Sequence, residues 1–267
     1  PSVAVSTGYL TPPPAMPRFP ILLSQHSTCI YDEAETLEIV NSVVTEFGVP
    51  ELAGLPEVYQ ATDQIIFSID MLDPYAAWRA MPSLPPMMGG EVGPVSDGDE
   101  IFVYLSNAKM ADPAFIEAIG NIGRPVRLFI PKLDPSLAAS FSSLNIRVER
   151  AAVPVNLIAK RSRLIVSAAQ HGITCLGIAS GLPQVSRPSD LEKQYNAEAV
   201  ERRGVMQLID DKDLPAHLFR STILNAYEDA AMARRARALA DELRSQFDIN
   251  QRKMIRRRIA DVMDNRI

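Results

Sequence analysis

Cysteine is scarce in this chain, and its scarcity limits the kinds of site the protein can hold. Only two cysteines, Cys29 and Cys175, occur among the 267 residues, and neither lies in a CxxC or Cys/His spacing. This distribution argues against a disulfide framework and gives no sign of a zinc site. We therefore expect a reducing, cytoplasmic location and no bound metal.

Long apolar runs, an excess of basic residues and a dinucleotide fingerprint are also missing. No apolar run reaches the roughly 18 residues that cross a bilayer, and no basic segment followed by an apolar one marks a secretory signal. The formal net charge of −5 and the pI near 5.3 argue against a protein that coats nucleic acid, because phosphate binding needs Lys and Arg. The lack of GxGxxG counts against a dehydrogenase. A small-molecule or protein partner fits this composition best.

Residues 1–90 offer few regular elements. Within residues 1–20, prolines from Pro12 to Pro20 oppose a regular helix or central strand, so we expect an extended loop. Apolar residues at helical spacing predict a helix over residues 32–47, with acidic residues in its first turn. Residues 64–69 read as a short buried strand. The segment at about 82–98 is rich in proline and glycine, and we interpret it as an interdomain linker.

From residue 99 onwards, apolar strand candidates alternate with amphipathic helix candidates. This alternation predicts right-handed βαβ units and a parallel sheet that is covered on both faces. We expect an α/β fold with a complete Rossmann-like domain over residues 99–247, whose last part, residues 216–247, is long and helical. Six strands are predicted, at 101–106, 126–131, 146–149, 164–168, 184–187 and 205–209. Ligands of such sheets bind at the carboxyl ends of the strands, near the switch in strand order.

Residues 162–205 carry an ordered set of motifs. Gly181-Leu182-Pro183 is followed by Glu192-Lys193, then Asn196-Ala197, and Gly204 closes the next helix. This order resembles the donor-binding segment of GT-B glycosyltransferases of the UDP-glycosyltransferase type. In that family a strand ends in a His-Gly-Gly turn, and a Gly-x-Pro, an acidic residue with Gln, and an Asn-Ala follow.

The resemblance continues upstream. TGYLTPPPAMPRFP is similar to a proline-rich loop of the family's first domain, and IDMLDPYAAWR to the turn before its linker. DEIFVYLSNAK and AAVPVNLIAKRSRLIVS are similar to two segments of its second domain. The resemblance thus implies a GT-B-like chain in which residues 1–90 form the C-terminal part of an acceptor domain and residues 99–247 form the nucleotide-sugar donor domain. Because the chain begins at Pro1, we expect the rest of the acceptor domain, with the family's histidine general base, to precede it.

The resemblance also implies which residues hold the donor. A helix that opens just after a strand presents unpaired N–H groups and a partial positive charge, which suit a diphosphate. Val155 matches a position whose backbone faces the nucleotide base, and Glu192 and Lys193 fall where the family contacts the donor sugar. The predicted diphosphate-binding residues are Ala169, Gln170, His171, Gly172, Ile173, Ser106 and Asn107. The resemblance implies a UDP- or dTDP-linked sugar as the donor substrate, and no cofactor is expected.

The chain departs from the family pattern at the His-Gly-Gly turn. Ala168, Ala169 and Gln170 occupy those positions, and His171 lies one place beyond them. Lys193 replaces a Gln, which turns a two-way hydrogen-bonding group into a pure donor. Three hypotheses stay open: a glycosyltransferase with a small-molecule acceptor, a catalytically degenerate relative that binds a nucleotide or a partner, and a Rossmann protein of other chemistry such as a sugar epimerase. No catalytic residue is assigned.

Several predicted roles have plain structural alternatives. His171 could be a capping-region residue, Glu192 could belong to the charged first turn of a helix, and Ser106 and Asn107 could cap the helix that follows them. Residues 248–267 predict a basic C-terminal helix with Arg252, Lys253, Arg256, Arg257 and Arg258. Such a helix could lie on an anionic membrane surface or present a solvated face.

Overall fold

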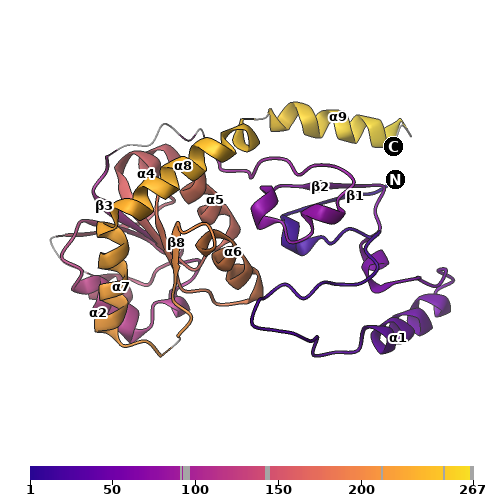
Figure 1. Cartoon of the computed structure of the whole chain (residues 1–267), viewed down its shortest axis with the longest axis horizontal. Coiled ribbons are helices and arrows are strands. Elements are labelled where there is room, and N and C mark those ends of the chain that lie inside the picture. Colours follow the sequence, from indigo (N-terminus) through magenta and orange to yellow (C-terminus); the bar gives the residue numbers. More distant parts are fainter. Residues whose placement is uncertain (91, 93–96, 142–144, 212, 249, 265–267) are drawn as a thin grey trace. The chain divides into compact units, whose positions relative to one another are not determined.

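The computed structural model describes residues 1–90, 92, 97–141, 145–211, 213–248 and 250–264 (Figure 1). The chain divides into two compact units. Pro1–Pro86 and Asp248–Ile267 form unit 1, and Met87–Phe247 forms unit 2. Residues 91 and 93–96 of the predicted linker lie outside the described residues.

Unit 2 is built on a parallel sheet of six strands with the order β5-β4-β3-β6-β7-β8. The α/β fold and the parallel sheet predicted from the sequence are therefore confirmed. From β3 the chain adds strands outward on one side and then returns to add β6, β7 and β8 on the other, so the strand order switches between β3 and β6. The strands are β3 Glu100–Tyr104, β4 Val126–Phe129, β5 Ile146–Glu149, β6 Ser162–Ser167, β7 Gln184–Ser186 and β8 Met206–Leu208.

Helices cover both faces of this sheet, as Figure 1 shows. Successive side chains of a strand point to opposite faces of the sheet, so neighbouring residues of β3 enter different cores. Ile101 and Val103 belong to the core beneath α2 and α7, whereas Phe102 belongs to the core beneath α4 and α5. The helices are α2 Pro113–Gly120, α3 Pro135–Ser140, α4 Val155–Arg161, α5 His171–Ala179, α6 Leu191–Glu201, α7 Ala216–Glu228 and α8 Ala230–Phe247, with a 3-10 turn at Ala108–Met110.

The helical stretch at 216–247 is two helices rather than one. Asp229 separates α7 from α8, and its carboxylate accepts hydrogen bonds from the backbone N–H groups of Ala231 (2.8 Å) and Met232 (2.9 Å). These bonds satisfy donors that the first turn of α8 leaves unpaired, as N-cap aspartates commonly do. The apolar spacing alone does not reveal this break.

A buried ion cluster crosses the first three strands of the sheet. The Arg127 side chain on β4 is 4% exposed, and its Nε donates to Glu100 on β3 at 2.8 Å. The same guanidinium pairs with Glu149 on β5. Arg147 and Arg161 add outer contacts to the two carboxylates, at 2.7 and 3.0 Å, with half or more of each side chain exposed. Arg127 is therefore the central cation of the cluster.

Unit 1 contains a parallel pair of strands, β1 Val3–Ser6 and β2 Asp63–Ile66, and two long helices. The prediction of loop throughout residues 1–20 is wrong at β1, which precedes the prolines and pairs along its whole length with β2. The helix predicted at 32–47 is α1 Glu33–Glu46, capped by the Asp32 carboxylate. Short 3-10 turns lie at Gly8–Leu10, Leu55–Tyr59, Asp70–Leu72 and Ala76–Trp78.

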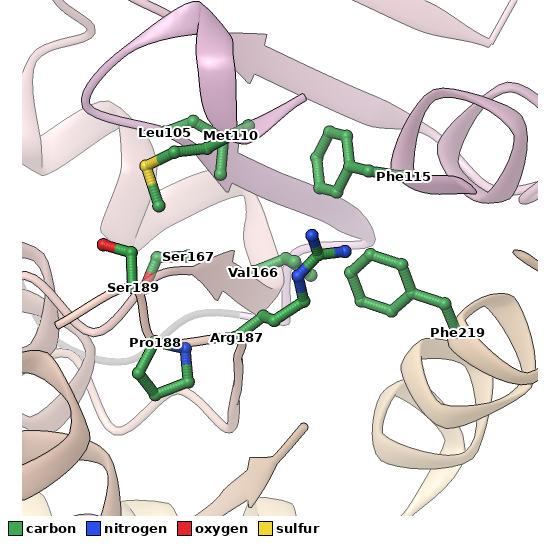
Figure 2. Close-up of a pocket in the computed structure, with 9 residues that line it drawn as sticks. All are labelled: Leu105, Met110, Phe115, Val166, Ser167, Arg187, Pro188, Ser189 and Phe219. Atoms are coloured by element: carbon green, nitrogen blue, oxygen red, sulfur yellow. The ribbon is translucent and has the colours of Figure 1, made fainter. Parts of the chain in front are cut away.

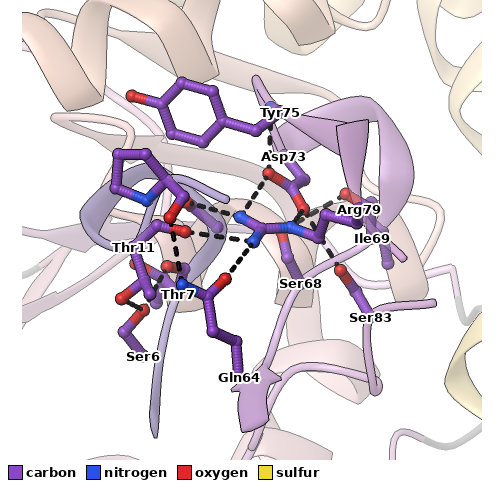
Figure 3. Close-up of polar contacts among 12 residues, drawn as sticks. Ser6, Thr7, Thr11, Gln64, Ser68, Ile69, Asp73, Tyr75, Arg79 and Ser83 are labelled. Atoms are coloured by element: carbon purple, nitrogen blue, oxygen red, sulfur yellow. Dashed lines mark hydrogen bonds and ion pairs between the residues drawn. The ribbon is translucent and has the colours of Figure 1, made fainter. Parts of the chain in front are cut away.

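A buried arginine ties the loops of unit 1 together (Figure 3). The Arg79 guanidinium pairs with Asp73 and donates to the carbonyl oxygens of Gly8 (2.9 Å) and Thr11 (3.0 Å). The Asp73 carboxylate also accepts a hydrogen bond from Ser83 at 3.2 Å. The proline-rich loop and the turn at 70–79, two segments that carry the family resemblance, are thus linked through one side chain.

The basic C-terminal segment is α9 Gln251–Met263, and its positive charges are divided between two sides. Arg258 is buried, and its guanidinium pairs with Asp63 at the start of β2 and donates to the Gln64 carbonyl at 2.8 Å. The remaining basic residues are exposed: Arg252, Lys253, Arg256 and Arg257. Among the described residues, no helix combines the length and apolar character that a membrane span needs.

Candidate functional site

The predicted diphosphate site is the turn that joins β6 to α5. Ala169 has φ of +58°, in the left-handed region that favours glycine. Three hydrogen bonds hold this turn. Ala169 N donates to Ser167 Oγ (3.1 Å), Ala168 N donates to Gln170 Oε1 (3.2 Å), and Asn196 Nδ2 of α6 donates to the Ala169 carbonyl (3.2 Å). These bonds hold Ala169 in the left-handed conformation although it is not a glycine.

The start of α5 is suited to an anion. Gln170 is the N-cap residue, and its side chain makes no cap hydrogen bond to the helix. Its Oε1 accepts from Ala168 N, whereas its Nε2 is buried and lacks a hydrogen-bond partner among the described residues. An uncapped helix start carries partial positive charge, and the Gln170 amide adds a neutral donor beside it.

The His171 side chain lies along its own helix. Its side chain is buried, and its ring nitrogens lie 3.7 and 3.9 Å from Cys175 Sγ, one helical turn further along α5. Burial raises the pKa of the Cys175 thiol. The imidazole thus packs against the helix to which it belongs, and Gln170 is the polar side chain at the helix start.

A cavity of about 260 Å³ adjoins the start of α5, and we call it the α5 cavity. It brings together Val155 of α4 and Gly172 and Ile173 of α5, three of the residues that the resemblance implies for donor binding. The full lining is Met87, Met88, Phe102, Tyr104, Phe129, Ala152, Val153, Val155, Ile158, Gly172, Ile173 and Leu176. The walls are mostly apolar, and a flat heterocyclic base would bury well against them.

Most of the lining residues were not predicted from the sequence, and two pairs among them stand out. Tyr104 and Phe129 end adjacent strands in register, and their rings stack with centroids 6.0 Å apart. Met87 and Met88 come from the segment that was interpreted as linker. Aromatic residues at the carboxyl ends of neighbouring parallel strands are a signal that could have found the first pair.

Glu192 and Lys193 lie in the first turn of α6 and do not line the α5 cavity. The Lys193 ammonium pairs with Asp190 and donates to Ser189 Oγ at 2.9 Å. Burial would raise the pKa of Asp190, but its bonds with Lys193 outweigh this and lower it. Burial raises the pKa of Glu192, and the Asp190 charge adds to the shift. Lys193 is therefore engaged with Asp190 and Ser189, and Glu192 lies next to it in the same helical turn.

Ser106 and Asn107 follow β3 and precede the 3-10 turn at Ala108–Met110. Ser106 is half-buried, with its Oγ 3.5 Å from Met110 Sδ, and Asn107 is exposed. They stand at the carboxyl end of β3 on one side of the switch in strand order, and α5 follows β6 on the other. Neither residue lines the α5 cavity.

No protein-family model matches this chain. Among curated proteins, it is 28% identical over 161 residues to oleandomycin glycosyltransferase of Streptomyces antibioticus, a match that covers 58% of this chain and 37% of that protein. It is 24% identical over 208 residues to a PGL/p-HBAD biosynthesis glycosyltransferase of Mycobacterium tuberculosis, which covers 74% of this chain and 44% of that protein. The chain thus spans about two fifths of the length of these relatives.

Solved structures of glycosyltransferases share the fold. The glycosyltransferase of kitacinnamycin superposes with a TM-score of 0.59 at 19% identity, covering 80% of this chain and 59% of that one. The glycosyltransferase VinC, solved in complex with dTDP, superposes with a TM-score of 0.58 at 16% identity, covering 78% and 54%. The resemblance to GT-B glycosyltransferases predicted from the sequence is confirmed, and the chain has their fold.

Proposed function

We propose that the protein is a glycosyltransferase that takes a sugar from a UDP- or dTDP-linked donor and transfers it to a small-molecule acceptor. The observation that carries this proposal is the α5 cavity, whose apolar walls adjoin the uncapped, Gln170-bearing start of α5. The cavity lies near the switch between β3 and β6, where sheets of this kind bind ligands. The glycosyltransferase relatives and the dTDP complex of a structural neighbour support the proposal.

The chemistry follows from the proposed placement. The acceptor oxygen attacks the anomeric carbon, the bond from that carbon to the phosphate oxygen breaks, and the nucleoside diphosphate leaves with the bonding electrons. The acceptor proton passes to a general base. Negative charge grows on the departing diphosphate, and the N-terminal dipole of α5 stabilises it there. Val155 and the cavity walls hold the heterocyclic base of the nucleotide, and Glu192 accepts hydrogen bonds from hydroxyl groups of the donor sugar.

Methyl NMR tests this placement, because Met87 and Met88 line the α5 cavity. With ¹³C-methyl methionine and assignments from Met→Leu variants, dTDP or UDP is expected to shift the Met87 and Met88 resonances. Thymidine and uridine should shift them more weakly, because the diphosphate supplies the contact with α5. The placement is contradicted if the diphosphates leave both resonances unmoved at millimolar concentration, or if the nucleosides bind equally well.

The exposed basic side of α9 supports a second, smaller proposal: contact with an anionic membrane surface by a protein that stays in the cytoplasm. The exposed basic residues would supply electrostatic attraction, and Ile259 and Met263 of the same helix, which are also exposed, would add apolar contact. Sedimentation with vesicles tests it. Anionic vesicles at low salt should carry the protein down, and equal sedimentation with zwitterionic vesicles would refute the contact.

A further inference from the structure

Unit 1 has a cavity of its own, with a volume of about 750 Å³. The start of α1, the loop before it and the 3-10 turn at Ala76–Trp78 form its walls, and we call it the α1 cavity. Its volume is typical of pockets that bind small molecules. The full lining is Pro17, Arg18, Phe19, Pro20, Ile21, Ser27, Thr28, Cys29, Tyr31, Asp32, Glu33, Ala34 and Trp78.

The α1 cavity is separate from the proposed donor site. The cavity shown in Figure 2, at the carboxyl ends of the strands of unit 2, belongs to the surroundings of the donor site, because Ser167 both lines it and holds the turn between β6 and α5. The α1 cavity shares no lining residue with that cavity or with the α5 cavity. A molecule bound there would therefore be a second ligand, held by unit 1.

Contacts within unit 1 hold the walls of the α1 cavity in place. Phe19 N donates to the two carboxylate oxygens of Glu33, at 3.2 and 3.3 Å. The Phe19 ring meets the Tyr59 ring edge to face, with centroids 6.2 Å apart. Trp78 directly precedes Arg79, the buried arginine that ties the loops together in Figure 3. The protein thus frames the cavity without help from a ligand.

Three aromatic side chains line the cavity: Phe19, Tyr31 and Trp78. Tyr31 and Trp78 are exposed, so a ligand can reach their rings. The face of an aromatic ring carries the negative part of its quadrupole and attracts cations, and tryptophan does so most strongly. The aromatic lining therefore suits an apolar molecule and, beside it, a positive charge.

Two carboxylates line the same cavity. Asp32 caps α1 through Oδ1, which accepts from the backbone N–H groups of Ala34 (2.8 Å) and Glu35 (3.2 Å), and this leaves Oδ2 outside the cap. Burial raises the pKa of Tyr31, and the Glu33 charge adds to the shift, so the field of this carboxylate acts on the Tyr31 side chain. Negative charge and aromatic rings thus meet in one place.

Arg18 is the basic residue of the lining, and it does not neutralise these carboxylates. Among the described residues, no basic side chain forms an ion pair with Asp32 or Glu33. Two carboxylates against one guanidinium give the lining a negative balance. An anion would meet repulsion from both acids, whereas a cation would be attracted by the acids and by the rings.

We propose that the α1 cavity binds a small, mainly apolar molecule that carries an ammonium group. The ammonium group lies between the aromatic faces and the carboxylates of Asp32 and Glu33, and the apolar part lies against Pro20 and Ile21. This assignment does not depend on the proposed glycosyl transfer.

Fluorescence tests the site directly, because Trp78 is the single tryptophan of the chain. We expect phenethyltrimethylammonium to change the Trp78 emission saturably. The alcohol 2-methyl-4-phenyl-2-butanol has nearly the same shape without the charge, and it should bind about fivefold to tenfold more weakly because it lacks the attraction to rings and carboxylates. The anion 4-phenylbutyrate should bind more weakly still.

Removal of the two charges provides the second arm of the test. In the double variant Asp32→Asn/Glu33→Gln, asparagine caps a helix as well as aspartate does, and glutamine keeps an oxygen for Phe19 N. This variant should bind the ammonium compound only as tightly as the alcohol. Glu38→Gln/Glu46→Gln removes two charges from exposed positions of the same helix outside the cavity, and it should keep the wild-type preference.

Three results would overturn the proposal. The first is an unchanged Trp78 emission at millimolar phenethyltrimethylammonium, and the second is equally tight binding of the alcohol or of 4-phenylbutyrate. The third is a folded Asp32→Asn/Glu33→Gln variant that keeps the wild-type preference for the ammonium compound. Titration with dTDP reports on the donor site separately, so either site can fail without the other.

Discussion

Replacement of Arg127 by methionine is expected to lower the free energy of unfolding by about 3–5 kcal/mol, the range typical of a broken buried ion pair. Arg127 is nearly inaccessible and sits between Glu100 and Glu149, whose side chains are 11% and 18% exposed. Methionine fills much of the same space but supplies no charge. The carboxylates of Glu100 and Glu149 would then stay in the sheet without their shared cation. Their negative charges would no longer be neutralised by Arg127, and the free energy of unfolding would fall.

Arg147→Met is the matched control for this experiment. Arg147 pairs with the same Glu149, at 2.7 Å, but its side chain is 68% exposed. Water and salt screen such a pair, so the change should cost only about 0–1 kcal/mol. Urea unfolding followed by circular dichroism measures both values. Equal stabilities of the two variants would show that the buried cluster contributes nothing particular to the sheet.

The architecture of unit 2 was accessible to sequence reasoning because its strands are short, continuous apolar runs. Such runs are typical of parallel strands buried on both faces, as Ile101, Phe102 and Val103 show by their burial. Each predicted strand overlaps an observed one, with ends that differ by a few residues. The turn and cap residues between them then leave few ways to connect the sheet.

Two features of the fold were not predicted, one because a distant strand decides it and the other because a single side-chain cap decides it. The strand β1 is short and lies just before a proline-rich segment, and it forms because β2, some sixty residues later, offers a parallel partner. The separation of α7 from α8 rests on the hydrogen bonds of one carboxylate, that of Asp229. The spacing of apolar residues indicates neither the distant partner of β1 nor the cap at Asp229.

The candidate site was predictable in outline and less so in detail. The topology places Val155 beside the start of α5, because both follow the carboxyl ends of strands in one sheet. Sequence spacing does not tell where a side chain points. His171 turns against Cys175, Lys193 pairs with Asp190, and Gln170 keeps an unpartnered donor at the helix start. The packing around each of these three side chains decides whether it faces the predicted site, and the sequence does not show that packing.

Gln170→Glu is expected to weaken dTDP binding on the order of tenfold to a hundredfold, through like-charge repulsion at short range. The new side chain has nearly the same shape, so its Oε1 can still accept from Ala168 N. It replaces the unpartnered Nε2 donor by an oxygen that carries negative charge. The helix dipole favours an acidic residue at a helix start and offsets the cost of charge on this buried atom, so the fold should keep its stability. Binding and stability are thus expected to respond differently.

Gln207→Glu is the control, since Gln207 is an exposed residue of β8 that does not line the α5 cavity. It carries the same change of charge and volume within unit 2, so it accounts for any effect of net charge on the affinity for an anion. We expect its dTDP affinity to match that of the wild type.

Isothermal titration of dTDP into the wild type, Gln170→Glu and Gln207→Glu tests most directly whether a nucleotide diphosphate binds at the start of α5. Binding to the wild type and to Gln207→Glu, with a marked loss in Gln170→Glu at undiminished thermal stability, is the predicted result. Equal affinities for all three proteins, or no binding to the folded wild type at millimolar dTDP, would contradict the donor site.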